Sequence, residues 1–312
     1  MINTGVVTKS TGSWYYVKTK TEAFSCKLKG KFRLHGIKST NPIAVGDIVE
    51  FTINAEDNTG VIYKINDRKN YIIRKSTNLS KQAHILASNI DYAFLVATIK
   101  QPKTYTEFID RFLVTCEANN IEGAIIFNKI DIYNENDNKQ LTELMDLYQN
   151  IGYKCIKISV EDEININEIE SLIEEKIIVI SGNSGVGKSS LINLLQPGLN
   201  LKTNEVSDSS QKGKHTTTFA EMHPIGNGYI IDTPGIKGFG LIDIETVKLS
   251  HYFPEMNSIR DKCKFNDCTH THEPGCAVKT ALENNEISMQ RYKNYLSMLE
   301  DGDSPYRLDI FK

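Results

Sequence analysis

Hydrophobic and polar positions divide the chain into three stretches with different expected structures. Up to residue 72, short runs such as residues 13–17 and 47–51 have the composition of strands, and Gly, Asn and Pro residues punctuate them. Short strands at this spacing are typical of a small barrel. We therefore expect residues 1–72 to form an OB-type β-barrel.

Longer apolar runs alternate with helical patterns from about residue 74 onward. Buried strands are expected at residues 91–98, 124–127 and 177–180. Helices are expected at residues 108–119 and 141–150. This alternation predicts an α/β domain with a mostly parallel sheet over residues 73–240.

The last stretch, residues 241–312, has little apolar sequence around three clustered cysteines. Residues 286–300 have the periodicity of a helix, and the basic residues Lys279, Arg291 and Lys293 are assigned by default to a solvated face. We expect a mostly helical, zinc-binding domain, because a metal ion can organise a segment with a small core.

The composition is that of an ordinary globular protein. The chain has 312 residues, 40% of them hydrophobic and 24% charged, which is enough for two or three domains with their own cores. The N-terminus has no apolar run of signal-peptide length, and no stretch approaches the roughly 20 apolar residues that cross a bilayer. We expect a cytoplasmic protein with no membrane contact.

Positive charge is concentrated in the N-terminal stretch. The net charge of the chain is −3, yet residues 1–75 hold 13 Lys or Arg against 6 Asp or Glu. The basic residues include Lys27, Lys29, Lys31, Arg33 and Lys38. With the aromatic residues Trp14, Tyr15 and Tyr16, this excess favours an RNA-binding barrel. The alternative is that the aromatic side chains only fill and flank a strand.

A phosphate-binding loop follows the strand at residues 177–180. The pattern G-x-x-x-x-G-K-[ST] lies between this strand and a helix, so backbone N–H groups can surround the phosphates of a nucleotide. The residues expected to bind it are Gly182, Asn183, Ser184, Gly185, Val186, Gly187, Lys188, Ser189 and Ser190. Lys188 is expected to reach the outer phosphates and Ser189 to ligate Mg²⁺.

A base-selecting motif, Asn128-Lys129-Ile130-Asp131, follows the strand at residues 124–127. The Asp131 carboxylate can accept hydrogen bonds from guanine N1–H and its exocyclic amine, an arrangement that adenine cannot match. Ser159 stands where a loop that backs the base is expected. The alternative is that Asn128 and Asp131 only cap the following helix.

The order of the motifs indicates a circularly permuted GTPase, because the base-selecting motif precedes the phosphate-binding loop. A third element, Asp232-Thr233-Pro234-Gly235, ends a strand with an acid and a turn. Asp232 is expected to hold Mg²⁺ through water, and the Gly235 N–H to contact a γ-phosphate. Among the threonines 216–218, Thr217 is the preferred additional ligand of Mg²⁺.

Three cysteines and one histidine have the spacing of a metal site. Cys263, Cys268, His270 and Cys276 form the pattern C-x4-C-x-H-x5-C, and three thiolates with one imidazole make a closed tetrahedral zinc site. Four protein ligands leave no open position for catalysis. The alternative is three buried, reduced cysteines.

The chain closely resembles the RsgA (YjeQ/EngC) family of circularly permuted GTPases that depend on the small ribosomal subunit. The resemblance rests on the motifs at residues 128–131, 182–189, 214–218 and 232–235 and on the cysteine-rich segment, in that order, and spans nearly the whole chain. It implies an OB barrel, a permuted GTPase core, and a zinc domain with one structural zinc ion. His270 is then preferred over His272 as the fourth ligand.

The resemblance also implies a function in late maturation of the small ribosomal subunit. The expected partners are this subunit, its rRNA, GTP and GDP, with Mg²⁺ bound to the nucleotide. Docking is expected near the decoding region of the subunit, and GTP hydrolysis is expected to trigger departure. We expect a monomer. Ile236 occupies the position where Ras-like enzymes carry a water-orienting glutamine. His215 is therefore the candidate for positioning the attacking water, and intrinsic hydrolysis should be slow.

Three other interpretations stay open at this point. A P-loop ATPase or kinase would use the same phosphate loop but would leave Asn128 and Asp131 without a role. An RNA-binding scaffold would bind GTP without turnover. An RNA-binding P-loop NTPase with no connection to ribosome assembly would share all the motifs.

Overall fold

The computed structural model describes residues 2–29, 42–54, 57–75, 83–199, 220–232 and 244–301. The chain separates into two compact units, each assembled from stretches that are distant in the sequence. One unit comprises Met1–Ala93, Asn167–Ile180 and Ser189–Ile236, and the other comprises Phe94–Ile166, Ser181–Lys188 and Lys237–Lys312. Within the described ranges, no helix has the length and apolar content needed to span a membrane.

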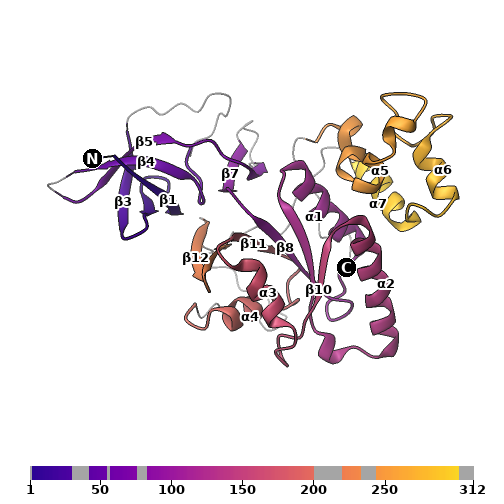
Figure 1. Cartoon of the computed structure of the whole chain (residues 1–312), viewed down its shortest axis with the longest axis horizontal. Coiled ribbons are helices and arrows are strands. Elements are labelled where there is room, and N and C mark those ends of the chain that lie inside the picture. Colours follow the sequence, from indigo (N-terminus) through magenta and orange to yellow (C-terminus); the bar gives the residue numbers. More distant parts are fainter. Residues whose placement is uncertain are drawn as a thin grey trace, which may run out of the picture. The chain divides into compact units, whose positions relative to one another are not determined.

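The N-terminal strands form a closed five-stranded barrel, as the sequence predicts (Figure 1). The strands are β1 (Ile2–Ser10), β2 (Tyr15–Lys18), β3 (Ala23–Leu28), β4 (Ile48–Ile53) and β5 (Gly60–Ile65). Their order is β1-β2-β3-β5-β4, and β4 pairs back onto β1. Alternation along β2 explains its orientation, because Tyr15 and Val17 are buried in the barrel core while Tyr16 and Lys18 are exposed.

A hairpin that the sequence did not predict follows the barrel. It consists of β6 (Tyr71–Lys75) and β7 (Ala83–Ser88). The fully buried Asp47 connects it to the barrel, because its carboxylate accepts hydrogen bonds from Arg68 Nε at 2.6 Å and from Ser88 Oγ at 2.6 Å. The predicted domain boundary at residue 72 falls inside β6 and stays a prediction.

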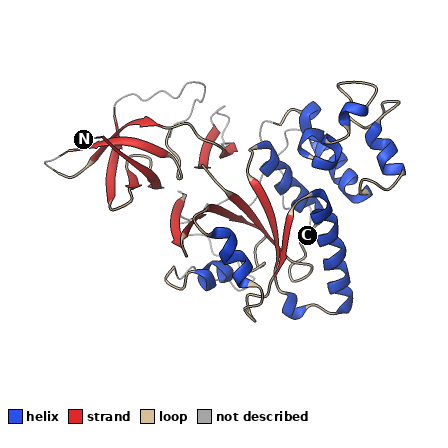
Figure 2. Ribbon diagram, viewed as in Figure 1, coloured by secondary structure: helices blue, strands red, loops and turns tan. Residues whose placement is uncertain are grey.

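The predicted α/β region contains parallel strand pairs together with helices (Figures 1 and 2). Its strands are β8 (Tyr92–Ala97), β9 (Glu122–Phe127), β10 (Lys154–Lys157), β11 (Ile177–Ser181), β12 (Glu221–Ile225) and β13 (Gly228–Asp232). Its helices are α1 (Thr106–Ala118), α2 (Glu135–Ile151), α3 (Ile166–Ile173) and α4 (Lys188–Leu195), with a 3-10 turn η1 at Ile130–Ile132. In one unit β10 pairs in parallel with β9, and in the other β11 pairs in parallel with β13.

Two helix boundaries differ from the prediction for local reasons. The helix predicted at residues 141–150 begins at Glu135, because Asn134 and Asp137 form a capping box ahead of the apolar periodicity. The helix predicted at residues 286–300 begins only at Met289, and Ser288 O, just ahead of it, accepts from Tyr292 N at 3.0 Å.

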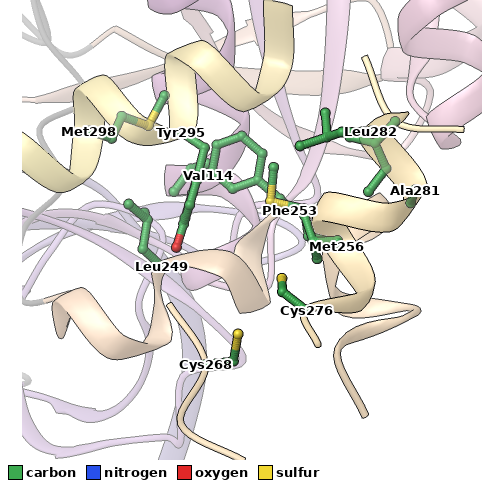
Figure 3. Close-up of a cluster of buried hydrophobic side chains, with 12 residues drawn as sticks. Val114, Leu249, Phe253, Met256, Cys268, Cys276, Ala281, Leu282, Tyr295 and Met298 are labelled. Carbon is green, nitrogen blue, oxygen red and sulfur yellow. The ribbon is translucent and has the colours of Figure 1, made fainter. Parts of the chain in front are cut away.

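All the elements in the described part of the C-terminal region are helices or 3-10 turns, and loops connect them (Figure 2). Its elements are η2 (Thr246–Tyr252), α5 (Pro254–Asn257), η3 (Arg260–Lys262), α6 (Ala277–Glu283) and α7 (Met289–Asp301). Phe253, Met256, Tyr295 and Met298 pack with Val114 of α1 in one buried cluster (Figure 3). The GTPase helix supplies part of the core that this short segment lacks.

Candidate nucleotide-binding site and metal centre

The phosphate-loop segment connects β11 to α4, as the strand–loop–helix pattern predicts. Gly182 and Gly187 have positive φ angles of 141° and 98°. A β-carbon would lie 2.3 Å from Val96 O at Gly182 and 2.3 Å from Asn128 Nδ2 at Gly187, so only glycine fits either position. Lys188 Nζ donates to Gly182 O at 2.7 Å and to Asn183 O at 2.5 Å, which folds the lysine over the loop.

Asn128 joins the phosphate loop to the base-backing loop. Its side chain is buried, and Nδ2 donates to Val186 O at 2.9 Å while Oδ1 accepts from Val160 N at 3.2 Å. One amide therefore uses both its donor and its acceptor to fix two loops from distant parts of the sequence. Residues 128, 159 and 182–188, predicted separately from three motifs, are brought together.

Asp131 is exposed, and Ser159 holds one of its oxygens. Ser159 Oγ donates to Asp131 Oδ1 at 2.7 Å, and the buried Ser159 also accepts from Asp162 N at 3.0 Å. The carboxylate keeps acceptor capacity for the two N–H groups on the guanine edge. Asn134, rather than Asn128 or Asp131, caps α2, so the capping interpretation is wrong for this helix.

Tyr133 is a supporting residue that the motifs did not reveal. Its hydroxyl donates to Asn128 O at 2.7 Å and accepts from Ile99 N at 2.8 Å, and burial raises the pKa of Tyr133 to about 12. Lys129 has a left-handed backbone with φ 68°, and its Nζ donates to Gln101 O at 2.6 Å. Both contacts attach the base motif to the loop between β8 and α1.

The parts of the site that would contact magnesium and the γ-phosphate lie mostly outside the described residues. His215, Thr217 and Gly235 are among the residues that the structure does not describe. Asp232 ends β13, whose neighbour β11 leads into the phosphate loop, and only its backbone is described. The roles expected of these four residues stay predictions.

Cys263, Cys268, His270 and Cys276 converge on one point in the C-terminal region. Their ligand atoms all lie within 4.8 Å of one another. His270 Nδ1 faces the cluster, 3.4 Å from Cys276 Sγ and 3.6 Å from Cys263 Sγ. Ligand atoms at zinc bond lengths of about 2.0–2.3 Å would be about 4 Å apart, so the donor set fits a zinc ion. His272 is exposed and lies outside the set.

The chemistry of these donors also fits a metal. Burial raises the pKa of the Cys268 thiol to about 12 and raises that of Cys276, so these two thiols must lose their protons when they bind a metal. Burial lowers the pKa of His270, which favours the neutral imidazole that ligates metals. His270 Nε2 has no hydrogen-bond partner among the described residues.

Glu273 organises the backbone around His270, which is a role that the sequence pattern did not suggest. One carboxylate oxygen accepts from Thr269 N at 2.7 Å and from Thr269 Oγ1 at 2.6 Å, and the other accepts from Thr271 N at 3.0 Å. Burial alone would raise the pKa of Glu273, but these hydrogen bonds lower it to about 2. The carboxylate thereby supports the left-handed conformation of His270, whose φ is 59°.

Arg291 corrects the expectation of a solvated face in α7. Its side chain is 1% exposed and pairs with Asp110 and Glu255. Lys293, in contrast, is exposed, and Lys279 is partly exposed. The apolar periodicity of α7 puts Arg291 on the polar face of the helix, which suggested contact with solvent. A single sequence does not show that α1 and α5 supply carboxylates to this face.

The aromatic residues of the barrel divide between core and surface. Tyr15 is buried, which agrees with the strand-filling alternative, whereas Tyr16 is 42% exposed. Lys27 Nζ lies 4.3 Å from the centre of the partly exposed Trp14 ring. Trp14, Tyr16 and Lys27 therefore form the described aromatic and basic surface, while Lys31, Arg33 and Lys38 lie outside the described residues.

Comparison with known proteins decides the family. The model of the RsgA N-terminal domain matches residues 4–62, and that of the RsgA GTPase matches residues 65–242. The chain belongs to the RsgA GTPase family. It is 54% identical to the small ribosomal subunit biogenesis GTPase RsgA of Flavobacterium psychrophilum, over 99% of this chain and 96% of the relative. It is 55% identical to the protein of the same name from Phocaeicola vulgatus, over 96% and 97%.

Solved structures of similar proteins share the RsgA fold. The crystal structure of YjeQ from Thermotoga maritima aligns with a TM-score of 0.79 at 37% identity, covering 96% of this chain and 98% of that one. The structure of YloQ, a circularly permuted GTPase, aligns with a TM-score of 0.77 at 31% identity, covering 96% and 95%. The predicted family, the permuted fold and the class of GTP-hydrolysing enzyme are confirmed, and the ATPase and kinase interpretations are wrong.

Proposed function

We propose that this RsgA-family GTPase binds the small ribosomal subunit, assists its late maturation, and hydrolyses GTP to GDP and phosphate faster when the subunit is bound. The names of its full-length relatives support the biological role. The observation that carries the chemical part is Asn128, whose amide fastens the base-selecting loop to the phosphate loop. That contact supports a single nucleotide site that includes both motifs.

In this proposal the nucleotide lies across the loops that Asn128 connects. Asp131, held by Ser159, accepts from the guanine edge, and the phosphates lie against backbone N–H groups of residues 182–190. Lys129 and Lys188 complete the base and phosphate contacts. Magnesium, when bound with GTP, would neutralise charge on the β- and γ-phosphates, and Ser189, Thr217 and Asp232 would hold it.

Catalysis is assigned to the segment after the phosphate loop. His215 positions the attacking water, and Gly235 contacts the γ-phosphate. Ile236 is aliphatic and cannot orient water, so the reaction depends on His215. Docking on the subunit completes the catalytic site, which explains why stimulation is expected.

The C-terminal cluster holds one structural zinc ion through Cys263, Cys268, His270 and Cys276. Convergence of all four ligand atoms supports this assignment. The barrel binds rRNA through the surface formed by Trp14, Tyr16 and Lys27, where bases can stack beside a positive charge. We assign residues 1–72, 73–240 and 241–312 to the barrel, the GTPase and the zinc domain, and propose that the protein acts as a monomer in the cytoplasm.

Phosphate release from GTP and from ATP, with and without purified small ribosomal subunits, tests the proposal. We expect slow release from GTP alone, strong stimulation by the subunit, and no comparable release from ATP. A His215→Ala variant that binds GTP normally but lacks stimulation would support the catalytic assignment. Release that is indifferent to the subunit would instead favour an RNA-binding NTPase with no connection to ribosome assembly.

A further inference from the structure

A buried charge cluster joins the C-terminal region to the GTPase core within one unit. Arg291 of α7 donates from Nη1 to Asp110 Oδ1 at 2.6 Å, and from Nε and Nη2 to the two Glu255 oxygens at 2.8 and 3.0 Å. Asn294 Nδ2 donates to Asp110 Oδ2 at 2.6 Å. Asp110 and Arg291 are 0% and 1% exposed, so each charge depends on its partner across the seam.

Asp110 also connects two helices of the core. It belongs to α1, and its Oδ1 accepts a hydrogen bond from Tyr148 Oη of α2 at 2.8 Å. The Arg291 guanidinium lies over the rings of Tyr148 and Phe253, at 5.7 and 4.7 Å. Helices α1, α2 and α7 therefore meet at a single carboxylate with a complete set of partners.

Both core helices begin beside the base-selecting motif. Helix α2 follows Tyr133 directly, and Tyr133 binds the Asn128 carbonyl. Helix α1 follows the loop that supplies Ile99 N to Tyr133 and Gln101 O to Lys129. A path of helices and hydrogen bonds therefore leads from Asp110 to the loop that carries Asp131.

The same α7 helix contacts the loop that carries the four metal donors, residues 263–276, here called the metal loop. Tyr292 Oη donates to His270 O at 2.7 Å, and Tyr295 Oη donates to Thr269 O at 2.6 Å. Tyr295 also packs against Phe253 beside Val114 of α1 (Figure 3). One rigid helix therefore contacts the metal loop through its tyrosines and the core through Arg291 and Asn294.

We propose that Asp110 and Arg291 are positioning residues that couple the metal centre to the guanine site, so that zinc and guanine nucleotide strengthen each other's binding. The inference rests on the proposed function only in taking the two ligands to be zinc and a guanine nucleotide. Coupling between two sites is reciprocal, so zinc must change the affinity for GDP by the same factor as GDP changes the affinity for zinc.

The test uses full-length, zinc-loaded protein without ribosomal subunits. Equilibrium competition with a chelator gives the zinc affinity with and without saturating GDP, and titration gives the GDP affinity with and without zinc. We expect each ligand to raise the affinity for the other by an equal factor of at least about five. GDP binding that ignores zinc would overturn the coupling alone, whereas absence of guanine-nucleotide binding would overturn the proposed function.

Variants separate coupling from a merely structural role. Asp110→Asn and Tyr148→Phe should bring the coupling factor close to one. Lys248→Met, which breaks the exposed ion pair with Glu245 in the same region, should leave the factor unchanged. If Asp110→Asn does not fold, Tyr148→Phe carries the test, because it removes one hydroxyl and touches neither ligand site. A wild-type coupling factor in the folded variants would overturn the inference.

Discussion

The base-selecting loop and the metal loop differ in how their functional side chains are held in the protein. In the base-selecting loop, the side chains of Asn128, Tyr133 and Ser159 donate hydrogen bonds to Val186 O, Asn128 O and Asp131 Oδ1, respectively. These polar groups are therefore paired without a nucleotide. In the metal loop, three thiols and an imidazole face one another within 4.8 Å, and His270 Nε2 has no partner among the described residues.

This difference indicates whether each loop can stay folded after its ligand, the nucleotide or the metal ion, has left. Hydrogen bonds from neighbouring loops hold the base-selecting loop, so we expect it to stay folded when GDP leaves. Hydrogen bonds also hold the backbone of the metal loop, but neutral thiols supply little attraction for one another, so we expect this loop to need its ion. We therefore expect the exchangeable ligand, the nucleotide, at the loop that is held by protein contacts. We expect the permanent ligand, the metal ion, at the loop that needs it for folding.

Removal of a metal ligand should have the largest effect. Cys276→Ala should abolish zinc binding and unfold the C-terminal region, since structural zinc sites contribute apparent binding energies of about 10–16 kcal/mol. Zinc content and hydrogen exchange over residues 244–301 measure both results. His272→Ala is the matched control and should keep full zinc content; a cluster that loses zinc only in this control would place the fourth ligand at residue 272.

A methyl group in the phosphate loop should damage the paired loop. In Gly187→Ala the new β-carbon would meet Asn128 Nδ2, and φ is 98°, so the amide must move and both its hydrogen bonds weaken. We expect GDP affinity to fall by about 100-fold or more, corresponding to about 3 kcal/mol. Gly12→Ala, at φ 84° with open space around it, should not change GDP affinity. Equal affinities in the two variants would contradict the contact.

The metal loop contains hydrogen bonds that do not need the metal, namely those of the Glu273 carboxylate with Thr269 and Thr271. Glu273→Gln tests their contribution to zinc binding. An amide cannot accept hydrogen bonds at both ends, so zinc affinity should fall by about 10- to 100-fold. Asp267→Asn removes the same charge from an exposed position in the loop and should have little effect.

The contribution of Glu273 should depend on pH in a defined direction. Its pKa is lowered from 4.5 to about 2, so the stabilising carboxylate is fully present above pH 4.5 and is lost as the pH falls toward 2. The difference in thermal unfolding between wild type and Glu273→Gln should shrink over that range. A difference that grows on acidification would show that the charge of Glu273 is unfavourable.

The smallest effect is expected at Tyr133. Tyr133→Phe leaves Asn128 O and Ile99 N without their hydroxyl partner, which should cost about 1 kcal/mol and lower GDP affinity about fivefold. Tyr16→Phe, on the exposed barrel surface, is the control. An unchanged GDP affinity in Tyr133→Phe would show that Asn128 holds the loop without support.

Local patterns predicted most of the fold and the cluster of metal donors. The strands at residues 91–98, 124–127 and 177–180 could be recognised because continuous apolar sequence is required of a strand covered on both sides. The convergence of the four metal donors also followed from spacing, because the cysteines and His270 are close in the chain. In both cases the physical cause acts over a few residues.

Supporting residues could not be predicted because their partners are distant in the sequence. Arg291 has the spacing of a solvated residue until Asp110, 181 positions away, is placed beside it. The sequence around Tyr133 does not show that its hydroxyl will meet Ile99 N, which belongs to the loop after β8. The pairing of polar groups in a folded core is set by tertiary contacts, which a single sequence does not display.

Base preference in Asp131→Asn tests the central claim most directly, namely that this loop is a guanine-selecting site joined to the phosphate loop. Xanthine has a carbonyl where guanine has its amine, so an amide at residue 131 can donate where the carboxylate accepted. Competition between GTP and XTP should show that wild type prefers GTP and that Asp131→Asn prefers XTP. A variant that keeps the wild-type preference for GTP would contradict the assignment of Asp131 and, with it, the account of the site.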